Sequence, residues 1–531
     1  MTEQPSTCFI FVWEKPSLPL AQVCSFIFEI FQRNPRSLRV HLVKKYRLAR
    51  IIFIIGLSLI VADLGKAFAD MPDKPLRHAQ DTSASSAQAR PNVLFIAIDD
   101  LITRLGCYGF DHIVSPNIDR LAREGVRFDR AYCQYPSCGP SRTSVLTGLR
   151  PQTTGMLHNK MVWRDLVPNA VTLPQYFMKH GYYTARVGKV FHQAVPMDIG
   201  TSGPDDPGSW NEVVNPRGRD KEEEDLLTVY SPTLRIADAM SFLKADGNNS
   251  EQTDGKVVDE TIRLLSEHKN KPFFIAAGLY RPHLPYIAPK QYFDLYSIEE
   301  TAFPSLPVDY RERVPDAALS STHIWPNFGT TELQVRECIL AYDACVSFVD
   351  AQIGRLIEAV DRLGLRQKTI IVLWGDHGYH LGEHGLWRKN SLYEESARAP
   401  LIFNVPGLKA DSSDCPRIVE FVDIYPTLAE LAGLEVPAEL EGVSLLPLLK
   451  NPNAQWDRPA FTQVFFSEIA GYSVRTDRWR YVEWGNRGDQ GMELYDQESD
   501  PKELNNLAGS TEHLDRIYTL RQLVHKNWPL N

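Results

Sequence analysis

The side chains best suited to chemistry follow apolar runs of strand length. NVLFIAI at 92–98 leads into Asp99 and Asp100, and TIIVLWG at 369–375 leads into Asp376-His377. Two adjacent carboxylates cannot both stay unpaired in a partly buried site, and a hard divalent cation with oxygen ligands is the usual partner. A turn or a helix N-cap explains the first pair well when it is taken alone. The second acidic position, after another strand, favours a metal site instead.

Two further runs of strand length end in basic and imidazole side chains. YYTARVG at 182–188 is followed by Lys189 and His192, and PFFIAAGLY at 272–280 is followed by Arg-Pro-His, which ends at His283. Ligands of open α/β sheets bind outside the carboxyl ends of the strands. We therefore expect one edge of the sheet to gather three carboxylates, at least three imidazoles and one or two cations.

The segment CGPSRTSVLTG at 138–148 predicts a reactive helix N-terminus. Pro140 and Ser141 favour a helix start, which places Cys138 where free N–H groups and the helix dipole favour an anion. Arg142 lies about one turn further along and can lean back over the same spot. A single cysteine is most often an inert buried thiol, but that explanation does not account for the residues around Cys138.

This segment resembles the signature of the type I sulfatases, C-x-P-S-R followed by L-T-G. The resemblance covers the chain from residue 92 to about 510. It continues through Asp99-Asp100, 188–192 (GKVFH), Pro282-His283, 375–378 (GDHG), 382–385 (GEHG) and Lys389. Within the family the chain is most similar to the iduronate-2-sulfatase group, on the segments 106–109 (GCYG), 187–192 (VGKVFH), 282–285 (PHLP), 376–377 (DH) and 471–476 (GYSVRT). His377 stands where many sulfatases have Asn, a departure that this group shares.

The resemblance implies a cofactor and a modified residue. Cys138 would be oxidised to formylglycine (3-oxoalanine) by a formylglycine-generating enzyme during export. Calcium would be held by the residues at positions 99, 100, 138, 376 and 377, namely Asp99, Asp100, the modified Cys138, Asp376 and His377. Calcium prefers oxygen ligands, so His377 is the least secure of them on physical grounds.

The resemblance also implies catalytic roles for the remaining site residues. Arg142, Lys189 and Lys389 would neutralise the sulfate. His283, with Lys389, would protonate the departing alcohol, and His192 would remove a proton from the hydrated formylglycine. Taken singly, these side chains are more often surface charges or core histidines than site residues, but their joint occurrence at the offsets of the family favours the site. Nearby, we expect His384 to contact substrate and His380 to be structural.

The remaining pattern predicts an α/β fold around a mostly parallel sheet, and the resemblance implies that it is alkaline-phosphatase-like. Continuous apolar runs indicate strands buried on both faces, at 92–98, 182–188, 272–280, 369–375 and 400–405. Helical patterns lie between them, at 115–125 with Ser115 as N-cap, 257–268 and 338–363. These elements form a catalytic domain over 92–455. Alternating patterns after that point predict a small antiparallel C-terminal subdomain over 456–531.

The N-terminal region reads as a leader for export. A basic segment at 44–50, an apolar run at 51–62 and Ala-Phe-Ala at 67–69 follow the order of a secretory signal within residues 1–69. The apolar run is short for a bilayer span, and an uncleaved membrane anchor is the alternative. Residues 1–43 are anomalous before such a signal and suggest a mis-assigned start. Residues 70–91 read as a linker.

Charge and cysteines narrow the function further. The chain has 57 Lys+Arg and 66 Asp+Glu, a net charge of −9, which lacks the basic excess typical of a nucleic-acid-binding protein and excludes that class. The leader alone carries nine basic and four acidic residues, so the remainder is more acidic, at −14. Eight cysteines are spread thinly, and Cys338 and Cys345 are expected to be two buried thiols rather than a disulfide.

These features predict an exported, calcium-dependent sulfatase that acts on a sulfated sugar, such as the 2-O-sulfate of a uronic acid at a chain end. One alternative on the same scaffold is a choline-sulfatase or a phosphonate or phosphate ester hydrolase. The other is a sulfated-glycan-binding protein without turnover, which the intact set Cys138, Arg142, Lys189 and His192 disfavours.

Overall fold

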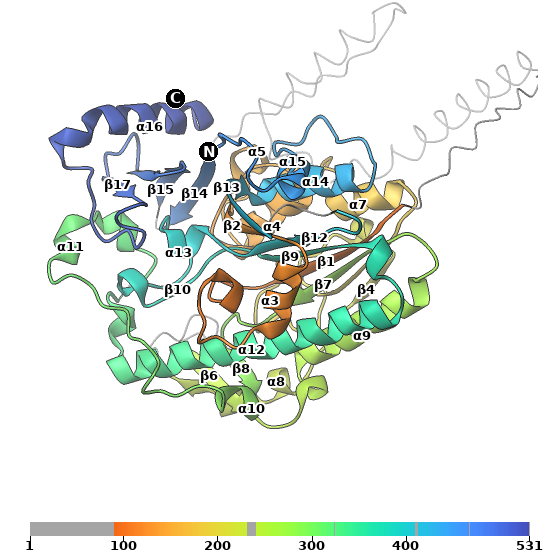
Figure 1. Ribbon diagram of the computed structural model, residues 1–531. Coiled ribbons are helices and arrows are strands. Elements are labelled where there is room, and N and C mark those ends of the chain that lie inside the picture. Colours follow the sequence, from red (N-terminus) through yellow and green to blue (C-terminus); the bar gives the residue numbers. More distant parts are fainter. Residues whose placement is uncertain (1–89, 231–239, 323, 409–412, 467, 530–531) are drawn as a thin grey trace, which may run out of the picture. The chain divides into compact units, whose positions relative to one another are not determined.

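The central sheet of the protein has eight strands with helices on both faces (Figure 1). The computed structural model describes residues 90–230, 240–322, 324–408, 413–466 and 468–529. The predicted leader and nearly all of the predicted linker lie outside these residues. Among the helices that are described, none combines the length and apolar character needed to cross a membrane.

The sheet is mostly parallel, as the sequence predicts. Its strands, in spatial order, are β13 (Asp414–Glu420), β2 (Val126–Tyr132), β12 (Leu401–Asn404), β9 (Thr369–Gly375), β1 (Asn92–Ile98), β7 (Phe273–Leu279), β3 (Tyr183–Gly188) and β4 (Glu212–Val214). All neighbouring pairs run parallel except the two made by β12, which is antiparallel to β2 and β9.

The five predicted apolar runs all form strands of this sheet, and their side chains pack into two hydrophobic core layers, one on each face. In β1, Leu94, Ile96 and Ile98 pack on one face, and the alternate residues pack on the other. The first face is covered by α3 (Pro116–Arg123), α9 (Thr253–His268) and α12 (Glu332–Arg362), and the second by α4 (Cys138–Thr147), α7 (Leu173–Lys179), α14 (Ile424–Leu431) and α15 (Leu446–Lys450). Burial on both faces explains why these strands have continuous apolar sequences.

The predicted helices are present with shifted ends. α12 begins six residues before the predicted start, because Thr331 and Gln334 form a capping box there. Ser115 precedes α3 as predicted, but its hydroxyl does not cap the helix; it accepts a hydrogen bond from the backbone N–H of Gly106 at 2.9 Å. Cys338 and Cys345 are buried free thiols on α12, as predicted.

Shorter elements complete the fold. The short helices are α5 (Pro151–Thr154), α6 (Trp163–Leu166), α8 (Arg219–Glu222), α10 (Lys290–Phe293), α11 (Tyr310–Arg313) and α13 (Glu394–Ala397). One small sheet consists of β5 (Thr228–Val229), β6 (Ser241–Ala245) and β8 (Tyr286–Pro289), in that order. Another consists of β10 (His380–Leu381) and β11 (Trp387–Arg388).

Strand register brings the predicted site residues to one edge. Ile98 lies beside both Leu279 and Gly375, and Gly188 lies beside Gly278, so the residues after four strands meet at the same level. A side chain at Gly278 is impossible without rearrangement, since its Cβ would lie 2.1 Å from the backbone oxygen of Lys189. This glycine therefore lets the chain cross close to β7 as it leaves β3.

A four-stranded antiparallel sheet stands apart from the central one near the C-terminus. It consists of β14 (Ala460–Phe466), β15 (Ile469–Arg475), β16 (Trp479–Trp484) and β17 (Met492–Asp496), and α16 (Leu514–Asn527) packs against it. The alternating patterns of the sequence predicted this sheet.

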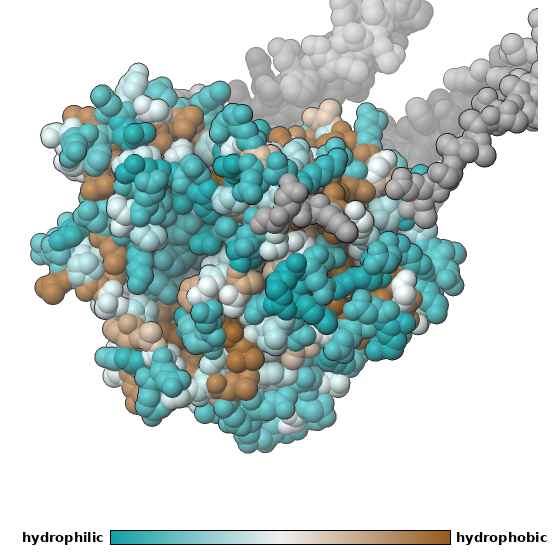
Figure 2. Space-filling model, in the orientation of Figure 1, coloured by the Kyte–Doolittle hydropathy of each residue, from teal (hydrophilic) through white to brown (hydrophobic). Residues whose placement is uncertain are grey.

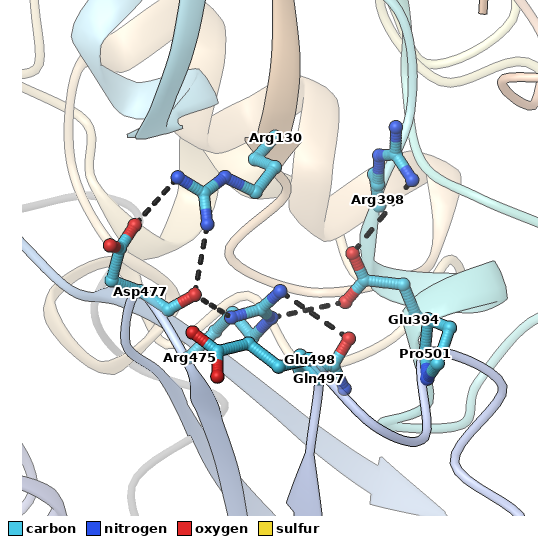
Figure 3. A pocket seen from close by; sticks show the side chains of 8 residues that line it. All are labelled: Arg130, Glu394, Arg398, Arg475, Asp477, Gln497, Glu498 and Pro501. Carbon is cyan, nitrogen blue, oxygen red and sulfur yellow. Dashed lines mark hydrogen bonds and ion pairs between the residues drawn. The ribbon is translucent and has the colours of Figure 1, made fainter.

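A buried ion network joins this second sheet to α13. Arg480 donates to Glu394 and, at 2.5 Å, to Glu503, and Tyr132 donates to Glu394 at 2.7 Å. Figure 3 shows the outer side of this junction, a cavity of about 400 Å³ into which Arg475 and Glu394 project. Arg480 and Glu503 are fully buried, so each charge depends on its partner.

Arg480→Met should destabilise the protein by about 3–5 kcal/mol, because Glu394 and Glu503 would lose the buried guanidinium that donates to both of them. Thermal unfolding of the purified variant measures the effect. Arg478→Met is the matched control, since the side chain of Arg478 is about half exposed and water can solvate its charge. Equal losses in the two variants would contradict this account of the junction.

Candidate active site

The acidic residues of the site are placed by backbone hydrogen bonds at the strand ends. The N–H of Asp99 donates to Leu279 O at 3.2 Å, and the N–H of Asp100 donates to Oδ1 of Asp376 at 3.1 Å. Asp100 has a φ of +57°, a left-handed conformation that turns the chain out of β1. The carboxylates of Asp99, Asp100 and Asp376 thus face one small volume from two neighbouring strands.

Cys138 is the first residue of α4 and its sulfur lies at the centre of this volume. Its Sγ is 3.4 Å from Oδ1 of Asp99, 3.3 Å from Nε2 of His377 and 3.2 Å from Nζ of Lys389. The side chain is buried. The predicted helix start at the cysteine is confirmed, and the thiol meets a carboxylate, an imidazole and a cation at once.

Arg142 leans back over the helix start, as predicted from its spacing. Its Nε donates to Oδ2 of Asp376 at 2.8 Å, and its Nη1 donates to Lys189 O at 2.7 Å. Nη2 lies 3.5 Å from Oδ1 of Asp99 and has no hydrogen-bond partner among the described residues. One donor of this buried guanidinium is therefore left over for another ligand.

Each of the three carboxylates forms an ion pair with a different basic side chain. Lys189 contacts Asp99 at 2.5 Å, Lys389 contacts Asp100 at 2.5 Å, and Arg142 contacts Asp376 at 2.8 Å. Burial opposes ionisation of Asp99, yet Lys189 holds its pKa well below the usual value. Burial likewise acts against Asp376, and Arg142 lowers its pKa. These two carboxylates are negatively charged at neutral pH.

Asp100 is the odd member of this set. Burial raises its pKa in spite of Lys389, and its Oδ2 is a buried atom that accepts no hydrogen bond from the described residues. A carboxylate oxygen in that state is suited to a further cation. One ligand atom from each of Asp99, Cys138, Asp376 and His377 also lies within 4.8 Å of the other three.

His377 presents its Nε2 to the cluster. Its Nδ1 lies 2.8 Å from Gly378 O, and that contact requires the proton on Nδ1. Nε2 then carries the lone pair and lies 3.4 Å from Oδ1 of Asp100. Burial lowers the pKa of His377, and Lys389 lowers it further, so the ring is neutral and able to bind a metal.

The two remaining imidazoles border the same cluster. Nδ1 of His283 lies 2.6 Å from Leu284 O and its Nε2 lies 3.7 Å from Oδ2 of Asp100. Burial, with Lys389 next, lowers the pKa of His283. Burial lowers the pKa of His192 well below its ordinary value, followed by the charge of Lys189. All ten predicted site residues thus surround one centre.

His380 and His384 have other partners. His380 lies 2.6 Å from the hydroxyl of Ser391 and is buried. His384 stacks on Tyr393 at 3.8 Å between ring centroids and lies 3.3 Å from Glu395. It lines a cavity of about 480 Å³, and Figure 2 shows a hollow near α13 and β10 on this face. Its contact with substrate stays a prediction.

Asn159 is a site residue that the sequence analysis missed. Its Oδ1 accepts from the N–H of Gly139 at 2.8 Å and from the hydroxyl of Ser137 at 3.0 Å, so it holds the backbone on both sides of Cys138. The hydroxyl of Ser141 fixes the other side of the turn by donating to Asp376 O. Ser141 is part of the signature, whereas Asn159 follows no periodic pattern that could have revealed it.

Comparisons with known proteins identify the family of the chain. Residues 91–434 match the sulfatase family, and residues 382–527 match the family described as N-sulphoglucosamine sulphohydrolase, C-terminal. The chain is 35% identical over 460 residues to a sulfatase of Formosa agariphila, covering 82% of this chain and 87% of that protein. It is 34% identical over 531 residues to iduronate 2-sulfatase of Mus musculus, covering 83% and 95%.

A solved structure confirms the predicted alkaline-phosphatase-like fold. The phosphonate monoester hydrolase of Agrobacterium radiobacter superposes with a TM-score of 0.68 at 21% identity, over 82% of this chain and 95% of that one. At that identity the likeness concerns the fold alone. The family match and the identity to curated sulfatases go further: the chain belongs to the sulfatase family and is a sulfuric ester hydrolase.

Proposed function

We propose that the protein is an exported, calcium-dependent sulfatase that removes a 2-O-sulfate from a uronic acid of a sulfated sugar, with formylglycine at position 138. The observation that carries the chemistry is the meeting of Cys138 Sγ with Asp99, His377 and Lys389 within 3.4 Å at the start of α4. The similarity to iduronate 2-sulfatase supports the substrate class.

The charges of the site fit a divalent cation. Three buried carboxylates and three buried cations cancel, so Ca²⁺ would leave a surplus of two positive charges for an anionic ester. The free Oδ2 of Asp100 and the lone pair of His377 Nε2 are available ligand atoms. When bound by Asp99, Asp100, position 138, Asp376 and His377, calcium would supply Lewis-acid polarisation of a sulfate oxygen.

The cations of the site bind the sulfate group. Arg142 has one unpartnered donor, and Lys189 and Lys389 each place an ammonium within 2.5 Å of a carboxylate that calcium would share. Arg142 and Lys189 are inaccessible to solvent, whereas Lys389 keeps a side-chain exposure of 10%. Lys389 therefore lies on the side from which the ester enters, and it can follow the charge onto the leaving oxygen.

Two histidines divide the proton transfers. His283 has its Nδ1 proton bound to Leu284 O, so Nε2 is the atom that faces the site. Burial lowers the pKa of this ring, so Nε2 can pass a proton to the departing alcohol only from the doubly protonated form, which the negative charge of a bound ester favours. His192, neutral because burial depresses its pKa, is suited to take a proton at position 138. The formylglycine would supply a hydrated aldehyde as nucleophile, whose second hydroxyl allows sulfate release without attack at sulfur.

The proposal extends to maturation and domain organisation. Residues 1–69 act as a leader and residues 70–91 as a linker. A formylglycine-generating enzyme is then the partner during export. Residues 92–455 form the catalytic domain and 456–531 the C-terminal subdomain.

Formylglycine is expected at position 138 in protein co-expressed with the maturing enzyme. Mass spectrometry of the peptide containing residue 138 measures it, and Cys138→Ala provides the unmodified control. If residue 138 is found entirely as unmodified cysteine in such a preparation, the catalytic assignment is refuted.

Asp376→Asn should lower turnover by roughly 10²–10³-fold, since it removes a metal ligand and the partner of Arg142. Calorimetric titration with Ca²⁺ should show weakened binding, and this readout does not require activity. Asp343→Asn is the matched control, because Asp343 is equally buried but pairs with Arg104. Unchanged calcium affinity in Asp376→Asn would argue against the metal assignment.

A desulfation screen tests the substrate. Defined disaccharides that carry a 2-O-sulfated uronate, a 6-O-sulfated hexosamine or an N-sulfate should be compared with choline sulfate and a phosphonate monoester. We expect the highest kcat/KM for the 2-O-sulfated uronate at a chain end. Preference for any other member would reassign the substrate while leaving the sulfatase chemistry in place.

A further inference from the structure

The turn that carries His283 is held by a buried network of three ionisable residues outside the reaction centre. Asp254, in the first turn of α9, accepts the N–H groups of Tyr280 and Arg281, both at 2.8 Å. Asp220, in α8, lies 3.1 Å from Nη2 of Arg281. The exposed fractions of Asp254, Asp220 and Arg281 are 1%, 3% and 1%. Two buried carboxylates thus hold the chain in place where it leaves β7.

Arg281 also donates hydrogen bonds to the backbone of the turn itself. Its Nη1 donates to the carbonyl oxygens of His283 at 2.9 Å and of Pro285 at 2.7 Å. The carbonyl between these two belongs to Leu284, and it is the one that receives the Nδ1 proton of His283. The guanidinium therefore fixes the backbone on both sides of the group that orients the imidazole.

The same network reaches a second loop of the site. Asp220 accepts the N–H and the hydroxyl of Thr253 at 2.7 and 2.6 Å, which locks α8 onto the start of α9. Tyr280 donates its hydroxyl to Oε1 of Gln193 at 2.8 Å, next to His192. Displacement of the 280–285 turn would thus be felt at both proton-transferring histidines.

We propose that Asp254 and Arg281 are positioning residues that aim Nε2 of His283 at the leaving oxygen. The inference rests on the proposed function, in which His283 is the acid. As the nucleophilic oxygen at position 138 bonds to sulfur, the S–O bond to the alcohol breaks and its electron pair passes to the alcohol oxygen. That oxygen then takes the proton from Nε2 of the doubly protonated His283 ring. A misdirected ring slows this transfer even when the ring is present and the fold is intact.

Leaving groups of different basicity separate positioning from stability. A sugar alcohol leaves poorly and needs the proton, whereas 4-nitrophenolate leaves readily without one. Loss of a purely structural contact lowers the fraction of active protein and so reduces turnover of both esters equally. Loss of positioning acts mainly on the sugar ester and on kcat rather than KM.

The experiment uses the full-length, calcium-loaded enzyme with a 2-O-sulfated uronate disaccharide and 4-nitrophenyl sulfate. Asp254→Asn is nearly isosteric, and its amide cannot accept both N–H groups. We expect kcat for the disaccharide to fall about tenfold, with KM changed less than about twofold and 4-nitrophenyl sulfate turnover nearly retained. Arg281→Lys, which keeps the charge but not the double contact, should behave in the same way and serves if Asp254→Asn folds poorly.

Controls separate this inference from the function on which it rests. His283→Gln should lower disaccharide turnover by roughly 10²–10⁴-fold, and adding Asp254→Asn to it should have no further effect. Arg480→Lys disturbs an equally buried network in the second sheet and should affect both esters alike.

Each outcome decides one of the two claims. Equal losses on both esters, or full additivity with His283→Gln, would overturn the positioning role while leaving the acid role standing. If His283→Gln itself spares the disaccharide, the acid role fails instead. Failure of the enzyme to act on the disaccharide would count against the proposed substrate.

Discussion

The structure depends on the compensation of three buried carboxylates at one edge of the central sheet. Asp99, Asp100 and Asp376 are inaccessible or nearly so, and removing such charges from water costs several kcal/mol per ion unless each has a close partner. Lys189, Lys389 and Arg142 supply those partners from three different segments of the chain. The register of β1, β7, β9 and β3, and the absence of a side chain at Gly278, follow from the need to bring these segments together.

This local neutrality also explains how an acidic protein can take an anionic ester. Outside its leader the chain carries a net charge of −14, which repels sulfate at long range. Within the site the fixed charges cancel, so the proposed divalent cation would decide the sign of the local potential. With that cation bound, the affinity for sulfate would be controlled by metal loading rather than by the charge of the surface.

The parts of this architecture that have local signals could be predicted from the sequence. Strands buried on both faces are continuous apolar runs, and all five of those runs were found, together with the polar residues that follow them. β2, β4 and β13 were missed, because they lack the continuous apolar runs by which the other strands of this sheet were found. β2 reads VRFDRAY, and β13 contains Pro416 within a register shift. Their burial depends on the neighbours that the fold brings to them.

The site residues also divide into those with a local sequence signal and those without one. Cys138, Arg142 and the residues after strands were predictable from the signature and the strand ends, while Lys389 depended on the family resemblance. Asn159 and Asp254 were invisible, since each acts by accepting backbone N–H groups from residues that are 20 and 26 positions away. No pattern of residue types marks such acceptors, and only the folded chain reveals them.

His377 illustrates how the charge constraint selects a residue that ligand preference alone would disfavour. Calcium favours oxygen ligands, and by that preference alone a fourth carboxylate would suit this position. A fourth carboxylate, however, would have no cation to match it among the three that the site contains. An imidazole held neutral by burial, with its proton bound to Gly378 O, would add a ligand atom to the proposed metal site without adding charge. The residue that the sequence marked as the least secure ligand is therefore the one that leaves the charges of the cluster balanced.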